Sequence, residues 1–244
     1  MGIIGTLLPP PGGQYGCTPM TEPAINWKAR AVSAADAVAH LRNGTNVFIH
    51  GACATPTPLI EALCARHDLE GVRLYHLHTS GPAPFAAPDR GKEFRSVSLF
   101  TGSPLRAAVA EGRADFVPIF LSDIPGLFLS GNVPLDVAVL QVSPPDRHGM
   151  CSLGTSCDAA KAAATTARIV IAEINAQMPR THGNNVLPLA NLHAFIATDR
   201  PLLEHHAEPE TPVEARIGEI VAELIEDGST LQMGIGAIPD AVLT

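Results

Sequence analysis

The sequence predicts an α/β fold in which a mostly parallel sheet carries helices on both faces. Strand-like and helix-like segments alternate along most of the chain, and two strand candidates, 136–142 and 168–174, are apolar at most positions. Continuous apolar strands of this kind are typical of sheets covered on both faces. Of the 244 residues, 46% are hydrophobic but only 5% are aromatic, so small aliphatic side chains are expected to fill the core.

The individual elements follow from apolar periodicity and from the turn residues between them. Helices are expected over 33–41, 58–66, 104–111, 157–165 and 213–225, with a helical turn over 124–128. Strands are expected over 46–50, 72–76, 116–120, 136–142, 168–174, 194–197 and 230–233. The best-marked boundary is the start of helix 213–225, where Thr211 can act as the cap and Pro212 suits the first turn.

Composition divides the chain into three parts. Residues 1–26 are rich in Gly and Pro and are expected to be disordered or loosely attached; they lack the features of a signal peptide, and Met20 offers an alternative start. Residues 27–211 are expected to form the first domain, which ends in the polar stretch 201–211. Residues 212–244 are expected to be the start of a truncated second domain.

Charge and cysteine content narrow the function classes. The net charge of −8 argues against nucleic acid and anionic membrane surfaces as partners, because both select for a basic face. No apolar run reaches the length of a membrane span. The five cysteines form no CxxC pair and are too scattered for a disulfide framework, which favours a cytoplasmic location.

The first candidate site is the loop that follows strand 46–50. In open α/β sheets, ligands bind at the carboxyl ends of the strands. His50, Gly51, Thr55 and Pro56 lie in such a loop, where the glycine permits close backbone approach and small residues leave room for a ligand. We expect these four residues to line a cleft, although an ordinary turn is the simpler interpretation of the loop taken alone.

Two further loops follow buried strands. Segment 143–149 is dense in turn formers and holds Arg147 and His148, which could meet a phosphate, although a plain turn is the simpler interpretation. Glu173 lies at the end of strand 168–174 and Asn175 two residues further on, so the two side chains share one face and could line the same cleft. A structural role for Glu173, as a carboxylate that accepts from nearby backbone amides, is equally consistent with the pattern.

The fourth candidate is the glycine pair Gly234 and Gly236, which follows strand 230–233. Backbone amides at such a turn, together with the start of the next helix, can hold an anion. The pair lacks the third glycine of the dinucleotide-binding fingerprint, so it is weak evidence by itself.

Other chemistries find little support in the sequence. His76 and His78 alternate on one strand, but no third ligand lies at a telling spacing, so no metal site is expected. There is no GxSxG nucleophile elbow and no P-loop.

Four segments in sequence order carry a resemblance to a known family. They read VFIHGACATPTPLIEAL (47–63), DVAVLQVSPPDRHGMCSLGTSCDAAKAA (136–163), IVIAEINAQMPRTHG (169–183) and LQMGIGAIPDAV (231–242). Together they resemble the acetyl-CoA hydrolase/transferase family, which includes acetate and 4-hydroxybutyrate CoA-transferases. The resemblance implies two tandem domains of the NagB/RpiA/CoA-transferase-like fold, with the active site between them.

The resemblance also implies a mechanism and a set of CoA contacts. The substrates that it implies are an acyl-CoA and a small carboxylate. It also implies that no metal takes part and that the intact protein is a homodimer. A glutamate in a His-[Thr/Ser]-Glu-Met motif acts as nucleophile through a glutamyl-CoA thioester. Contact with CoA carries over to the segment Gly234, Ile235, Gly236, Ala237 and Ile238.

No catalytic residue carries over, because the glutamate motif has no match before Thr244. The order His50-Gly51-Ala52 also differs from the GHA order of some family members, so no specific role carries over to His50. We therefore expect these 244 residues alone to be inactive. Two alternatives remain open: an acyl-CoA hydrolase of the same family, and a non-catalytic CoA-binding or structural half that needs a second subunit.

Overall fold

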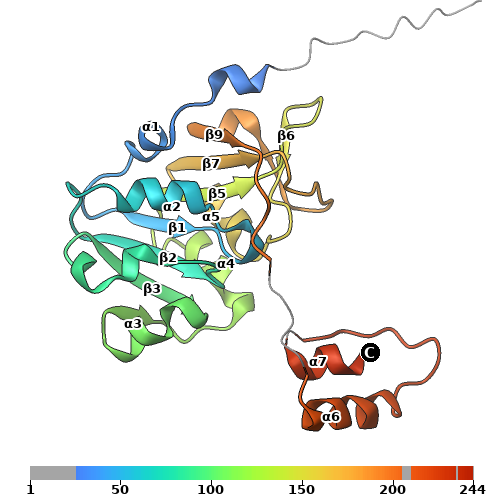
Figure 1. Cartoon of the computed structure of the whole chain (residues 1–244). Helices are drawn as coiled ribbons and strands as arrows, with labels where there is room; N and C mark the ends of the chain where they lie inside the picture. Colours follow the sequence, from blue (N-terminus) through green and yellow to red (C-terminus); the bar gives the residue numbers. More distant parts are fainter. Residues whose placement is uncertain (1–25, 205–209, 235, 244) are drawn as a thin grey trace, which may run out of the picture.

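The computed structural model describes residues 26–204, 210–234 and 236–243, and its centre is a seven-stranded parallel sheet (Figure 1). The strands are β1 (Asn46–Ile49), β2 (Val72–Leu77), β3 (Phe94–Phe100), β4 (Ala114–Phe116), β5 (Val137–Val142), β7 (Ile169–Asn175) and β9 (Ala194–Thr198). Their order across the sheet is β4-β3-β2-β1-β5-β7-β9, and every neighbouring pair is parallel. The predicted α/β class with a mostly parallel sheet is confirmed.

Helices cover both faces of this sheet. The covering helices are α1 (Ala34–Val38), α2 (Thr57–Cys64), α3 (Arg106–Ala110), α4 (Ile124–Leu129) and α5 (Ala160–Thr166). Two further helices, α6 (Pro212–Ala222) and α7 (Ala237–Val242), follow in the chain and pack on each other. A small antiparallel pair, β6 (Met150–Ser152) with β8 (Val186–Pro188), lies apart from the main sheet.

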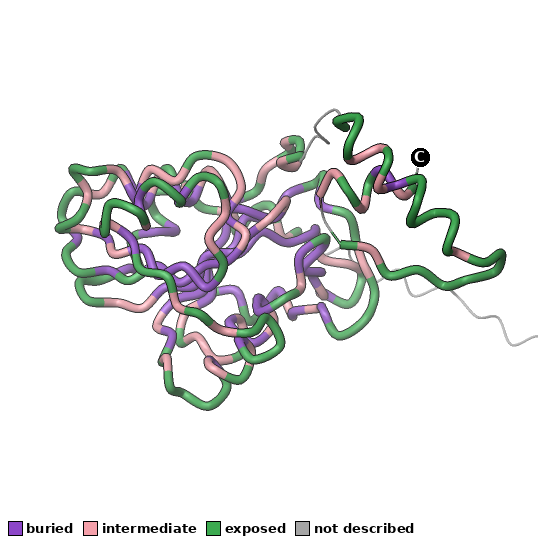
Figure 2. The backbone as a smooth tube through the Cα atoms, turned by 90° about the horizontal axis from the view of Figure 1, so that it is seen from below, coloured by how far each residue is buried: buried purple, intermediate pink, exposed green. Residues whose placement is uncertain are grey.

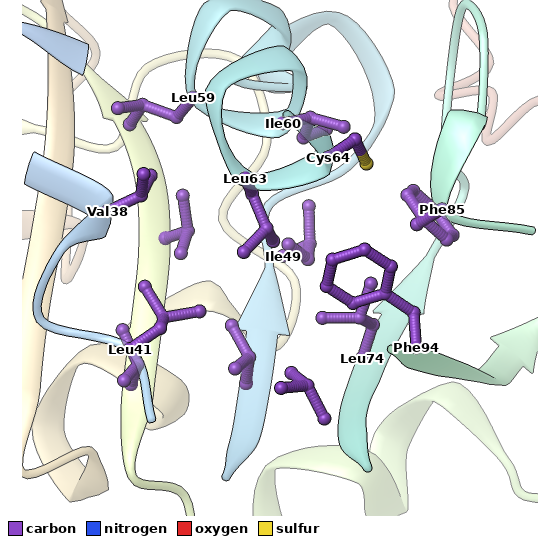
Figure 3. Packing of buried hydrophobic residues seen from close by; sticks show 14 of the residues in the cluster. Val38, Leu41, Ile49, Leu59, Ile60, Leu63, Cys64, Leu74, Phe85 and Phe94 are labelled. Carbon is purple, nitrogen blue, oxygen red and sulfur yellow. The ribbon is translucent and has the colours of Figure 1, made fainter. Parts of the chain in front are cut away.

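Alternate side chains of the central strand β1 divide the core into two layers. Val47 and Ile49 pack on one face with residues of α1 and α2, as Figure 3 shows around Leu59 and Leu63. Phe48 points to the opposite face, where it meets Phe128 edge-on at 5.7 Å between ring centroids and packs with α4 and α5. The period of two along a strand makes this division, because neighbouring residues face opposite sides of the sheet. In Figure 2 the buried backbone is concentrated in the strands and the exposed backbone in the helices and loops around them.

The structure corrects several predicted strands. The strand expected over 116–120 is instead β4 at Ala114–Phe116, and Phe120 is 78% exposed. The strand expected over 230–233 is absent, because a strand requires a partner and no other segment pairs with these residues in the described part of the chain. Strand β3 and the short strands β6 and β8 were not expected.

The helices agree better with the predictions, although most are shorter. The helix expected over 213–225 is α6, which ends at Ala222. Its start is a full capping box: Thr211 Oγ1 accepts from the Glu214 N–H at 3.3 Å, and the Glu214 carboxylate accepts from the Thr211 N–H at 2.7 Å. None of the helices in the described residues combines the length and the apolar character needed to cross a bilayer.

Candidate functional site

The strand order reverses between β1 and β5, and this reversal locates the candidate site. From β1 the chain builds outward through β2 and β3 to β4, and it then returns to place β5 on the other side of β1. In open parallel sheets, ligands bind in the crevice outside the carboxyl ends of the strands at such a switch point. The loop after β1 and the loop after β5 therefore have the most favourable position in the fold.

The loop after β1 is held tightly against the end of β2. A Cβ on Gly51 would lie 2.0 Å from the backbone oxygen of Leu77, so only glycine fits at this position. The next residue, Ala52, donates its N–H to the carbonyl of His78 at 2.7 Å. Both Ala52 and His78 have positive φ angles, 50° and 48°, which are costly for residues other than glycine. Strained backbone is thus concentrated at the switch point.

His50 lies beneath this loop and has no exposed surface. Its Nδ1 accepts from the Gln141 N–H at 3.3 Å, so Nε2 carries the proton and donates to the Ser156 carbonyl at 2.6 Å. Burial lowers the pKa of His50 below its usual value, more than these hydrogen bonds and the charge of Asp158 raise it. The imidazole is therefore neutral near pH 7, with both nitrogens engaged, and it ties the end of β1 to the segment before α5.

Glu173, at the end of β7, is completely buried and paired. Its Oε1 accepts from Thr198 Oγ1 at 2.7 Å and from Arg200 Nε at 2.7 Å, and its Oε2 accepts from Arg200 Nη2 at 2.9 Å. The two parallel contacts form a bidentate arginine–carboxylate pair, the strongest common geometry for such a pair. Both carboxylate oxygens thus accept from Arg200, and Oε1 also accepts from the neutral hydroxyl of Thr198.

Asn175 and Gln141 extend the network to the loop after β1. Asn175 Nδ2 donates to Gln141 Oε1 at 2.9 Å, and Gln141 Nε2 donates to the Thr55 carbonyl at 3.1 Å. Arg200 Nη2 reaches the same Thr55 carbonyl at 3.1 Å. We define the switch-point network as Thr55, Gln141, Glu173, Asn175, Thr198 and Arg200. It joins the carboxyl ends of β1, β5, β7 and β9.

The structure thus brings together four sequence-predicted residues, His50, Thr55, Glu173 and Asn175, and buries all of them. Whether they line a cleft stays a prediction. Arg200 is not among the site residues predicted from the sequence. A signal for it did exist, because a buried carboxylate on one strand requires a cation nearby and Arg200 follows the neighbouring strand β9.

The loop after β5 is an ordered turn. Asp146 Oδ1 accepts from the N–H groups of His148 and Met150, both at 2.9 Å, and Arg180 Nη2 donates to Oδ2 at 2.7 Å. These donors, led by the Met150 N–H, hold the pKa of Asp146 below its usual value. Arg147 and His148 are exposed beside the turn, with the guanidinium Nε 3.0 Å from the imidazole.

The predicted CoA segment lies at the start of α7, and its Ile235 falls outside the described residues. Gly236 has a φ of 138°, a conformation that favours glycine. Helix α7 packs so closely on α6 that a Cβ on Gly218 would lie 2.5 Å from the Ala241 oxygen. Gly234 is exposed, Ala237 is half-buried and Ile238 is 43% exposed, so the segment presents backbone and apolar surface.

His76 of β2 and His78, which directly follows that strand, do not form a pair. His76 is buried, with Nε2 2.8 Å from Ser96 Oγ and Nδ1 3.0 Å from Thr79 Oγ1, and burial lowers its pKa to about 4. His78 instead packs on Phe100, with ring centroids 4.1 Å apart. Within the ranges that the structure describes, no group of three or more His, Cys, Asp or Glu side chains is arranged to hold a metal ion.

Comparisons with known proteins agree with this architecture. The family model for the acetyl-CoA hydrolase/transferase N-terminal domain matches residues 20–204. A succinyl-CoA:acetate/propanoyl-CoA:succinate CoA transferase of Fasciola hepatica is 50% identical over 208 residues, which are 84% of this chain and 43% of that protein. A 4-hydroxybutyrate coenzyme A transferase of Clostridium kluyveri is 41% identical over 218 residues, which are 89% of this chain and 51% of that protein.

Solved structures give the same result. A 4-hydroxybutyrate CoA-transferase from Porphyromonas gingivalis superposes with a TM-score of 0.72 at 38% identity, over 89% of this chain and 51% of that one. RipA from Yersinia pestis superposes with a TM-score of 0.80 at 28% identity, over 88% of this chain and 52% of that one. The chain spans about half the length of the relatives it matches. It belongs to the acetyl-CoA hydrolase/transferase family, whose N-terminal domain it contains.

Proposed function

We propose that this chain is the N-terminal part of a CoA-transferase that moves CoA between a short-chain acyl-CoA and a carboxylate. The observation that carries the proposal is the 50% identity to a relative named as a succinyl-CoA:acetate/propanoyl-CoA:succinate CoA transferase. The strained, glycine-dependent loop at the switch point supports it, because this is where the fold binds ligands.

The proposed chemistry is covalent and proceeds by a ping-pong mechanism. A glutamate carboxylate attacks the acyl-CoA carbonyl, and the C–S bond breaks to release CoA thiolate and leave an acyl-glutamyl anhydride. The thiolate then attacks the glutamyl carbonyl, releasing the acyl group as a carboxylate and leaving a glutamyl-CoA thioester. An incoming carboxylate reverses both steps. Together these steps divide one difficult transfer into several easier ones.

In this proposal, the residues of this chain bind CoA and form one wall of the active site. The described backbone of Gly234, Gly236, Ala237 and Ile238, with Ile235 between them, contacts CoA, and the Gly51–Pro56 loop borders the reacting carbonyl. The nucleophilic glutamate has no matching position in these 244 residues, and we place it in the half of the relatives that this chain does not span. The 244 residues alone are then inactive. The intact protein is a cytoplasmic homodimer that needs no metal.

Transfer assays test this proposal. The 244-residue chain and the chain continued by the codons that follow Thr244 in its gene are each incubated with acetyl-CoA and either propionate or succinate, and new acyl-CoA is measured by mass spectrometry. We expect transfer with parallel-line ping-pong kinetics in the continued chain only. Transfer by the 244 residues alone would contradict the placement of the nucleophile.

The two alternatives give different results in the same assay. A hydrolase releases free CoA from acetyl-CoA without an acceptor carboxylate, because water then intercepts the glutamyl thioester. A non-catalytic half gives neither product, and its gene is followed by a separate reading frame for a catalytic subunit rather than by an in-frame glutamate motif.

A further inference from the structure

We propose that Arg200 is a positioning residue that fixes the Gly51–Pro56 loop and the segment leaving the sheet in one arrangement. We call that segment, residues 199–204, the connector. Arg200 itself need not touch substrate; it acts through the loop that borders the proposed site. The proposal rests on the proposed function only where its activity readout is concerned.

The side chain of Arg200 contacts three separate segments of the chain. Its side chain donates to both oxygens of Glu173, to the Thr55 carbonyl at 3.1 Å and to the Pro201 carbonyl at 3.3 Å. One guanidinium therefore joins β7, the loop after β1 and the connector. Its planar fork makes these contacts simultaneously, which the ammonium of a lysine cannot do.

The backbone of Arg200 is also held by hydrogen bonds, from the side chain of Asn175. Asn175 Oδ1 accepts from the Arg200 N–H at 3.2 Å, and Asn175 Nδ2 donates to the Arg200 carbonyl at 2.9 Å. The same Nδ2 reaches Gln141, which shares the Thr55 carbonyl with Arg200. Displacing the side chain thus disturbs the loop and the connector together.

The connector runs across the carboxyl ends of several strands. It leaves β9 at the edge of the sheet, passes β7 at Arg200, and brings the side chain of Leu203 next to Gly81 in the loop after β2. A Cβ on Gly81 would lie 3.4 Å from Leu203 Cδ1. The orange trace after β9 in Figure 1 follows this course along the carboxyl ends of the strands. The connector therefore crosses the switch point on its way towards α6.

Burial distinguishes the Glu173–Arg200 ion pair from a second bidentate arginine–carboxylate pair in the protein. Glu173 is 0% exposed and the Arg200 side chain 22% exposed, whereas the bidentate pair Arg95–Asp115 is 41% and 48% exposed on β3 and β4. The Arg95 side chain donates to Asp115 and to the Gly112 carbonyl, which are not part of the Gly51–Pro56 loop. It supplies a matched control.

Hydrogen exchange of the full chain tests the proposal directly. In Arg200→Lys, the amides of residues 51–55 and of the non-proline residues of the connector should exchange about tenfold faster or more, while those of β3 stay at the wild-type rate. Arg95→Lys should leave the exchange of residues 51–56 unchanged. Unchanged exchange of the loop in Arg200→Lys, or equal acceleration in β3, overturns the proposal.

A second variant guards against simple unfolding. In Glu173→Gln combined with Arg200→Met, no unpaired charge is buried, and the loop should again exchange faster while β3 does not. A loop that keeps its wild-type exchange rate in this double variant overturns the proposal as well.

Kinetics separate positioning from a purely structural role. In a form of the protein that transfers CoA, Arg200→Lys should lower kcat about tenfold or more with little change in KM for the acyl-CoA, because the loop is misplaced rather than lost. Wild-type kcat in Arg200→Lys overturns the proposal. Absence of any transfer by the wild-type protein would instead contradict the proposed function and leave the exchange result standing.

Discussion

The two halves of the sheet differ at their carboxyl ends. In the half made of β1, β5, β7 and β9, buried polar side chains join neighbouring strands, and a buried carboxylate is paired on both oxygens. In the half made of β2, β3 and β4, Phe100 and Phe116 are 50% and 52% exposed at the carboxyl ends of β3 and β4, and the ion pair Arg95–Asp115 lies at the surface near the start of β3. A bidentate arginine–carboxylate pair should therefore contribute differently to stability in the two halves, because only the Glu173–Arg200 pair is buried away from water.

The largest effect should separate the two ion pairs. Arg200→Met leaves the carboxylate of Glu173 buried and unpaired, and should lower the free energy of unfolding by about 3–5 kcal/mol. Arg95→Met, at the exposed pair, should cost about 0–1 kcal/mol. Urea unfolding measures both. Equal costs for the two variants would show that burial does not distinguish the pairs.

Acid should lower the stability of the fold through His76, which lies in the half of the sheet that contains β2. Burial lowers the pKa of His76 to about 4 in the folded state, against 6.5 for the free side chain, so the unfolded chain binds more protons between these values. The contribution to stability is full above pH 6.5 and falls as the pH drops to about 4, by a total of about 3 kcal/mol. Thermal unfolding of wild type and His76→Asn from pH 7 to pH 4 measures it. An identical pH dependence in the two proteins would contradict this assignment.

The close contact between Gly51, after β1, and Leu77, at the end of β2, should be disrupted by one added methyl group. Gly51→Ala drives a Cβ into the Leu77 oxygen and should cost about 1–3 kcal/mol through forced backbone movement. Gly91→Ala is the control, because a Cβ there meets nothing within 4 Å. Chemical denaturation compares the two variants, and a Gly51→Ala protein as stable as Gly91→Ala would contradict the packing of the loop.

The smallest effect concerns the helices that follow the sheet. Thr211→Ala removes the cap of α6 and should lower helix stability by about 1 kcal/mol. Since no strand of the sheet contains Thr211, hydrogen exchange should accelerate in α6 and remain unchanged in β1 and β5. Acceleration in β1 would show that α6 supports the sheet.

Sequence reasoning succeeded where the pattern is local. Strands β5 and β7 are apolar at nearly every position, and the cap at Thr211 is a signal within four residues. Strand β3 was missed because Ser96 and Ser98 interrupt its apolar pattern, although both are buried and Ser96 bonds to His76. Strand 230–233 was wrong because periodicity does not supply a pairing partner.

The site was predictable only in part, for a related reason. Position in the pattern identified His50 and Glu173, since both lie at the carboxyl ends of buried strands. Arg200 lies 27 residues from Glu173 and 145 from Thr55, so its role depends on strand order. Strand order is a tertiary property that no local pattern contains.

The central claim, that ligand binds at the switch point, can be tested most directly by hydrogen exchange with and without saturating acetyl-CoA. We predict that protection appears in residues 51–56 and 234–238 and that β3 and β4 exchange as before. Protection confined to the β3–β4 end, or no protection at residues 51–56 although acetyl-CoA binds, would contradict the account.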